Sequence, residues 1–184
     1  MGAIYLVTLF LGFTVGYTTP AVAQAQAAHF QAMQGNYIHA QVLYMQVLVI
    51  FLTNTGLGII MMTVGYMIAQ TTGLWFGTLL IAPIQGYKTG AIIANVSSRG
   101  ADFILAAIIP HGILELSASF VAMGIGLLLG YHISMKRGEE PNYQGTVIIK
   151  KWKRIFYSYV VPMYFVAAII EVYVTPVVMY VVMH

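Results

Sequence analysis

The chain has no cysteine and very little charge. Of its 184 residues, 7% are charged and 60% are hydrophobic. The absence of cysteine excludes disulfides, thiolate metal ligands and a cysteine nucleophile. Soluble domains carry about 25% charged residues. A surface that faces water cannot be built from so few charges, so lipid must cover most of this protein.

The few charges leave long stretches of the chain uncharged. No Asp, Glu, Lys or Arg precedes Lys88. Residues 103–135 contain one such residue, Glu115, and residues 155–184 contain one, Glu171. A helix needs about 20 mostly apolar residues to span a bilayer. Each of these stretches is long enough to do so.

These stretches predict an all-α fold, a polytopic transmembrane helical bundle of about five spans in a single domain. The predicted helices cover residues 2–23, 42–69, 74–96, 103–131 and 156–182. Pro83, Gly86 and Lys88 interrupt the third helix, which is therefore either a kinked span or a broken, re-entrant one. Ala21–Ala23 resembles a signal-peptidase site, but the first residues lack the usual positive charge, so we expect a retained helix.

Basic side chains gather in one loop, His132–Arg154. It holds six of the eight Lys and Arg residues, namely Lys136, Arg137, Lys150, Lys151, Lys153 and Arg154. The positive-inside rule predicts that this loop is cytoplasmic in a cell-membrane protein, which puts the N-terminus inside with five spans and outside with four. The cluster either signals topology alone or also binds anionic headgroups. The aromatic residues near it are expected at the membrane interface: Trp152, Phe156, Tyr157 and Tyr159.

Two acids are predicted to lie near the middle of their helices. Insertion scales give a cost of about 2.5–3.5 kcal/mol for a charged residue there, so Glu115 and Glu171 need partners or must stay protonated. His111 precedes Glu115 by four residues, which places both on one face of a helix. Asn54 falls at a similar depth in its own helix. We therefore predict one polar centre formed by Asn54, His111, Glu115 and Glu171.

This predicted centre is open to more than one interpretation. It could bind a proton, a metal ion or a polar substrate. His111 and Glu115 supply two ligands only and the HExxH motif is absent, so the sequence predicts neither a metal site nor a cofactor. The competing interpretation is that the polar groups only join helices. Interhelical hydrogen bonds contribute about 0.6 kcal/mol on average, which is little against the cost of inserting two acids.

Small residues form faces on three predicted helices. Gly12 and Gly16 have GxxxG spacing, and a ladder at every fourth position follows Glu115: Ala118, Ala122, Gly126 and Gly130. On the last helix, small side chains share the side of Glu171: Ala167, Ala168 and Thr175. Such faces let backbones approach closely. They serve either packing within one chain or a homodimer seam.

The segment Pro110–Glu115 reads PHGILE and is followed by the Gly- and Ala-rich stretch Leu116–Gly130. It resembles the signature helix of the stage II sporulation protein M family, in which a PHGxxE motif opens such a helix. Ala167–Pro176, with its single acid, resembles the last span of the family, and Asn54–Gly90 resembles its middle. The resemblance covers residues 42–176.

This resemblance implies a multi-helical, all-α protein of the cell membrane. The family is named after a sporulation factor thought to join membrane-bound wall-degrading enzymes, but most of its members have no settled activity. The sporulation role is therefore not carried over to this chain.

The sequence favours a non-enzymatic membrane component that associates with a second copy or with another membrane protein. Its polar centre would hold a conformation or a small polar ligand. The alternative is a small proton- or cation-coupled transporter or channel that uses Glu115 and Glu171. A third hypothesis is an intramembrane enzyme with His111 and Glu115 as acid and base. No nucleic acid is expected as a partner.

Overall fold

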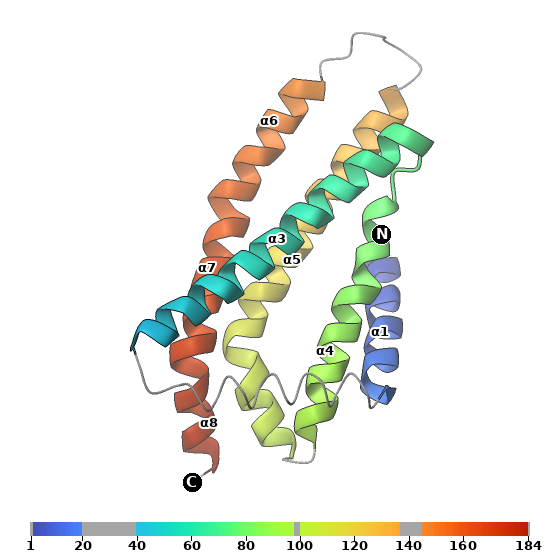
Figure 1. The fold of residues 1–184 in the computed structure, drawn as a ribbon. Helices are drawn as coiled ribbons and strands as arrows, with labels where there is room; N and C mark the ends of the chain where they lie inside the picture. Colours follow the sequence, from blue (N-terminus) through green and yellow to red (C-terminus); the bar gives the residue numbers. More distant parts are fainter. Residues whose placement is uncertain (1, 20–39, 98–99, 137–144, 184) are drawn as a thin grey trace. The chain divides into compact units, whose positions relative to one another are not determined.

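The computed structural model describes residues 2–19, 40–97, 100–136 and 145–183 (Figure 1). All regular structure in these ranges is helical, and they contain no strand. Three helices are long and apolar enough to cross a membrane: Leu43–Thr72, Ala101–Met135 and Ile149–Val182. Leu6–Thr18 is a shorter apolar helix. The all-α, polytopic membrane fold is therefore confirmed.

The described helices follow the predicted segments with shifted ends. The first four segments correspond to α1 (Gly2–Thr18), α3 (Ala40–Thr72), α4 (Ala82–Val96) and α5 (Ala101–Lys136). α3 and α5 extend beyond both predicted ends. The fifth is one continuous helical stretch formed by α6 (Gly145–Ile155), α7 (Val161–Ile169) and α8 (Thr175–Met183). Residues 20–23 of the first predicted helix lie outside the described residues.

The third predicted segment is irregular at its start and regular from Ala82 onward. α3 ends at Thr72, and Gly73 follows with a φ of +77°. The Gly73 N–H donates to the Ala69 carbonyl at 3.0 Å, and glycine suits this cap because it has no Cβ to clash. A 3₁₀ turn, Gly77–Ile81, then leads into α4, which has Pro83 in its first turn. α4 then runs without interruption through Pro83, Gly86 and Lys88, so the predicted interruption at these residues is wrong. A proline in the first turn of a helix removes no intrahelical hydrogen bond, so Pro83 is accommodated there.

The predicted basic loop, residues 132–154, is helical wherever it is described. α5 continues to Lys136 and α6 begins at Gly145, so the prediction of a loop over this whole range is wrong. Lys and Arg are good helix formers, and charge by itself does not end a helix. The described basic side chains of α6 are exposed: Lys150, Lys151, Lys153 and Arg154.

Two π-helical turns divide the C-terminal helical stretch, and each precedes a proline. They span Phe156–Val160 before Pro162 and Ile170–Val174 before Pro176. A proline has no N–H, and its ring clashes with the carbonyl four residues earlier. The amide that follows each turn donates instead to the carbonyl five residues earlier. The prolines thus account for the local change of helical register.

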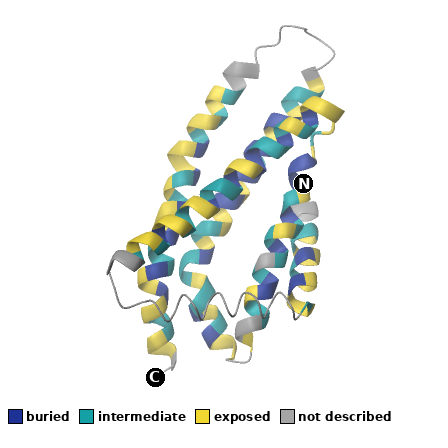
Figure 2. Ribbon diagram, in the orientation of Figure 1, coloured by how far each residue is buried: buried dark blue, intermediate teal, exposed yellow. Residues whose placement is uncertain are grey.

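Contacts group the chain into two compact units. The first comprises Met1–Ile50, Ile81–Gly112 and Ala168–His184, and the second comprises Phe51–Leu80 and Ile113–Ala167. Large apolar side chains are exposed on described helices of both units (Figure 2). Lipid is the natural environment for such surfaces, since a soluble monomer rarely exposes them on this scale.

In the first unit, four glycines let the backbones of α1 and α4 touch (Figure 1). An added Cβ would run into the backbone of the opposite helix: Gly12 into Pro83, Gly16 into Tyr87, Gly86 into Leu9 and Gly90 into Phe13. Residue numbers rise together along both helices, so α1 and α4 run parallel. Parallel spans need a segment that crosses back between them, and α3 is long enough to do this.

The second unit has an aromatic core over α3. Tyr164 and Phe156 are almost fully buried, and a Cβ on Gly58 would lie 3.0 Å from the Tyr164 ring. The hydroxyls of Tyr164 and Ser119 share a hydrogen bond of 2.9 Å. The Phe156 ring fills this core, and its predicted position at the depth of the membrane interface stays a prediction. Tyr157, the next residue, is exposed.

Candidate functional site

α5 carries His111 and Glu115 on consecutive turns. Their spacing of four residues places both on one side of the helix, and both side chains are half-buried. Pro110 lies inside α5 immediately before His111, and it removes the usual donor to the Ala106 carbonyl. The two units divide between Gly112 and the next residue. α5 is one helix through that point, so the helix itself fixes Glu115 one turn from His111.

The C-terminal helical stretch supplies the facing groups. Glu171 lies in the π-helical turn, and Thr175 begins α8. Thr175 is buried, and its hydroxyl lies 3.3 Å from Nδ1 of His111. The tautomer of the imidazole decides which of these two atoms donates. This hydrogen bond ties α5 to the start of α8 within the first unit.

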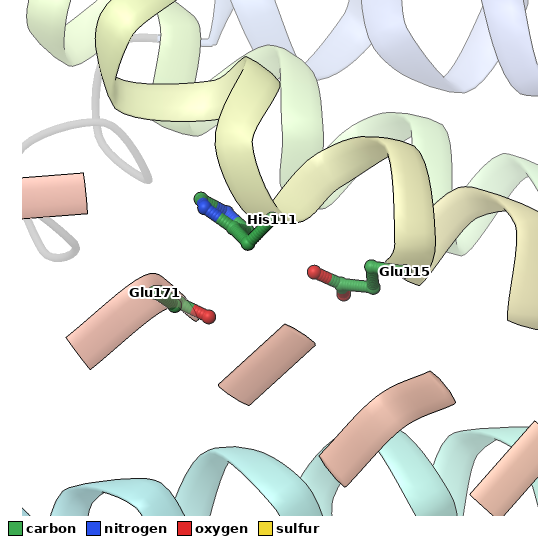
Figure 3. A group of neighbouring side chains, drawn as sticks. All are labelled: His111, Glu115 and Glu171. Atoms are coloured by element: carbon green, nitrogen blue, oxygen red, sulfur yellow. The ribbon is translucent and has the colours of Figure 1, made fainter. Parts of the chain in front are cut away.

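The structure brings His111, Glu115 and Glu171 together (Figure 3). One nitrogen or oxygen atom of each side chain lies within 4.8 Å of the corresponding atoms of the other two. In Figure 3 the imidazole and the two carboxylates lie around the same space. Two carboxylates at this separation repel each other when both are ionised. The arrangement therefore favours a proton or a cation among them.

An apolar groove of 410 Å³ lies beside this cluster in the first unit. Pro110, which adjoins His111, and Val178, one turn beyond Thr175, both line it. Its other lining residues are Asp102, Leu105, Ala106, Ile109 and Val182. Asp102 is the single acid among these residues and is exposed. The groove thus borders the His111–Thr175 contact with mostly apolar walls.

The remaining polar predictions are placed as follows. Asn54 is buried on α3 in the second unit, and its membership of the polar centre stays a prediction. On α6, the Lys151 ammonium lies 5.8 Å from the centre of the Trp152 ring. The Lys136 side chain and Arg137 lie outside the described residues. Binding of lipid headgroups by this basic group stays a prediction.

The predicted small-residue faces pack within the chain. The two glycines of α1 meet α4, as described above. On α5, Ala118 and Ala122 are fully buried. An added Cβ on Gly126 or Gly130 would run into backbone atoms of α3 or of the segment that follows it. A homodimer would therefore have to use surfaces other than these faces.

Sequence reasoning missed several features that the structure brings out. Gly86 and Gly90 are the partners of the α1 glycines, and their own GxxxG spacing could have identified them. Predicting the hydrogen bond between Thr175 and His111 would have required knowing that their two helices pack together. Residue spacing within one helix does not give this information. Thr78 is fully buried, and its hydroxyl has no hydrogen-bond partner among the described residues. No sequence pattern pointed to it.

The fold and the cluster define a class: polytopic, all-α membrane proteins with a His/Glu cluster inside apolar helices. Residues 2–176 match the model of the family described as stage II sporulation protein M, and the chain belongs to this family. The resemblance drawn from the PHGxxE segment is confirmed. The match also includes the region before Val42, which the resemblance had left out.

One relative is an uncharacterized protein from Methanocaldococcus jannaschii. The two chains are 29% identical over 115 residues, which covers 60% of this chain and 63% of that one. The chain thus spans less than two thirds of the length of this relative. No solved structure matches the chain. Neither the family nor this relative assigns a reaction or a ligand.

Proposed function

We propose that this protein is a non-enzymatic membrane component whose polar centre holds a small cation, a proton included. The cation would fix how α5 packs against the C-terminal helix. The observation that carries the proposal is the approach of His111, Glu115 and Glu171 to within 4.8 Å. Charged groups in a span cost about 2.5–3.5 kcal/mol each. A positive occupant offsets that cost, which helix joining alone would not.

The same geometry gives weaker support to catalysis. The hydroxyl in hydrogen-bond contact with His111 belongs to Thr175, which is buried. A nucleophile must reach its substrate, and this hydroxyl sits between two helices. The residues around His111 therefore suit binding better than acyl or phosphoryl transfer.

Transport is the second candidate, and one observation favours it. Glu171 lies in a π-helical turn, and His111 follows a proline inside α5. Transporter sites commonly form where membrane helices are irregular, because such helices present backbone groups and side chains to an ion. In this reading the centre would release its cation to either side of the membrane.

Neutralising the acids tests the binding proposal. Wild type, Glu115→Gln and Glu171→Gln are purified in lipid nanodiscs, and the infrared band of protonated carboxyl groups and the unfolding midpoint are followed against pH. We expect either variant to alter both, whereas Asp102→Asn, the same change at an exposed site of α5, should alter neither. Both variants behaving like wild type would contradict the proposal.

Reconstituted vesicles separate holding a cation from transporting it. Proton and cation fluxes are measured for wild type and for the Glu115→Gln/Glu171→Gln double variant. A wild-type flux that the double variant loses would establish transport. Equal fluxes, together with altered unfolding, would leave the centre a static binding site.

We further propose that the chain lies in the cell membrane with the α5–α6 connection in the cytoplasm. The basic residues beside this connection support it, and the parallel α1 and α4 fit five crossings. Because the chain has no cysteine, Gln144→Cys and Ser97→Cys each provide a unique thiol. In intact cells an impermeant maleimide should label Ser97→Cys and spare Gln144→Cys. The reverse labelling would invert the topology.

Association with a second copy or another membrane protein is also proposed. Its support is the small mass of the chain outside apolar helices. Mass measurement of the protein extracted in native lipid, without crosslinking, tests it. A monomer with no copurifying chain would count against association.

A further inference from the structure

The donor atoms of the His/Glu cluster suit a metal ion. Among the described residues, His111, Glu115 and Glu171 offer one ring nitrogen and two carboxylates within 4.8 Å of one another. In a tetrahedral zinc site, ligand distances of about 2.0–2.2 Å put neighbouring ligand atoms roughly 3.4 Å apart. Small rotations of the two flexible Glu side chains would bring the ligand atoms from within 4.8 Å of one another to the spacing that a zinc site requires. The sequence predicted no metal because only His111 and Glu115 were counted as ligands, although Glu171 was placed at the same centre.

The charge balance points to a divalent ion. Residues 103–135 and 155–184 contain no Lys or Arg, so the two helical stretches that bear the acids bring no permanent positive charge to them. A protonated His111 carries a single positive charge, which equals the negative charge of one carboxylate. A divalent cation balances both Glu115 and Glu171 and leaves the imidazole neutral, as a ligand must be.

The donor types narrow the choice of ion. Calcium takes six to eight oxygen ligands, and magnesium retains several waters in an octahedron of oxygen atoms. Imidazole together with carboxylate suits zinc, manganese or iron, and the absence of cysteine excludes a thiolate site. Three protein ligands leave at least one position open. That position would take a water molecule or a polar group of a partner.

Thr175 is placed to orient the imidazole. Its hydroxyl lies 3.3 Å from Nδ1 of His111, so Nε2 remains as the ring nitrogen available to a metal. Histidines that bind metals almost always hydrogen-bond through the other ring nitrogen, and loss of such a partner costs about 10–100-fold in affinity. Thr175 is buried, as expected for a positioning residue.

We propose that His111, Glu115 and Glu171 form an intramembrane site for one divalent transition-metal ion of the zinc or manganese type, with Thr175 orienting His111. The inference rests on the proposed function, because it names the cation that the polar centre holds. The site links α5 to the C-terminal helical stretch through coordination bonds. An ion there would stabilise the folded chain by a free energy that rises with the logarithm of the ion concentration above its Kd.

Metal titration of the untagged protein tests this site. The protein is purified without a polyhistidine tag, stripped of metal, and titrated separately with Zn²⁺, with Mn²⁺ and with Co²⁺, whose visible absorption reports coordination. We expect one ion per chain. Glu115→Gln, Glu171→Gln and His111→Gln should each weaken Zn²⁺ binding at least 100-fold, and Thr175→Val about 10-fold. The controls Asp102→Asn and His132→Gln should bind like wild type.

The outcomes separate this inference from the function on which it rests. If Zn²⁺, Co²⁺ and Mn²⁺ all fail to bind wild type, or bind all variants equally, the metal site is overturned. A protonated-carboxyl band that Glu115→Gln or Glu171→Gln removes would then leave the proposed function standing with a proton as occupant. If that band is also absent from wild type, both fail. Gln closely matches Glu in shape, and unfolding midpoints measured without Zn²⁺ check that each variant is folded.

Discussion

Between α1 and α4 the backbones touch at glycines, whereas α5 and α8 meet through the side chains of His111 and Thr175. Both pairs lie in the first unit. Glycine contacts depend on shape alone and have one tight arrangement. A pair joined by polar groups changes its energy when a proton or an ion binds or leaves. The first pair is therefore suited to be fixed scaffold, and the second to respond to a ligand.

The largest expected effect concerns the glycine contact between α1 and α4. In Gly86→Ala the new methyl group would run into the backbone of α1, and overpacking of this kind costs about 1–3 kcal/mol. Backbone atoms cannot rotate away as a side chain can, so α1 and α4 must separate. Denaturant unfolding in micelles measures the loss.

Gly124→Ala is the matched control, because a Cβ there meets nothing within 4 Å. Removing a glycine from a helix interior should stabilise it by about 0.5–1 kcal/mol. The two identical substitutions are thus expected to change stability in opposite directions. Equal effects would mean that α1 and α4 do not pack through their glycines.

The second prediction concerns Pro176, which follows the π-helical turn that carries Glu171. Without this proline the turn over Ile170–Val174 can return to α-helical bonding, and one residue corresponds to about 100° around an α-helix. The direction of Glu171 relative to Thr175 would then change, and with it the position of the Glu171 carboxylate relative to His111. We expect Pro176→Ala to weaken Zn²⁺ binding about 10-fold, by analogy with the loss of an orienting partner. Isothermal titration measures the change.

Pro162→Ala provides the comparison for this experiment. It removes the equivalent proline after the other π-helical turn, Phe156–Val160, and leaves the segment with Glu171 and Thr175 unchanged. Wild-type Zn²⁺ affinity is expected. If both proline variants lose affinity equally, the effect comes from general loosening of the helix rather than from the register at Glu171.

The sequence predicted what depends on charge and spacing. The uncharged stretches indicated the long apolar helices, and the i, i+4 spacing placed His111 beside Glu115. Matching depths also brought Glu171 to the same centre. The prediction of the apolar helices is confirmed, because the bilayer restricts where charge can lie. That the three side chains form one functional centre stays a prediction.

Other features depend on which helices meet, and no pattern within one segment specifies that. The parallel pairing of α1 with α4 and the bond from Thr175 to His111 belong to this kind. The burial of the Phe156 ring is another example, because it depends on which helix packs against that side of the C-terminal stretch. A π-helical turn is also hard to foresee, since a proline in a membrane helix can produce a kink instead.

The smallest expected effect tests whether every polar contact between these helices behaves like the His/Glu cluster. Tyr164 and Ser119 share a buried hydrogen bond of 2.9 Å in the second unit, between neutral groups that need no ion. Tyr164→Phe and Ser119→Ala should each cost about 0.6–1.7 kcal/mol, the range found for interhelical hydrogen bonds. A double-mutant cycle in detergent unfolding isolates the bond, with the exposed Tyr157→Phe as control. The coupling should not depend on added Zn²⁺, because neither hydroxyl belongs to the cluster. A coupling energy that rises with Zn²⁺ would show that the metal affects contacts beyond its ligands. The fixed contacts between helices could then not be distinguished from those that respond to an ion.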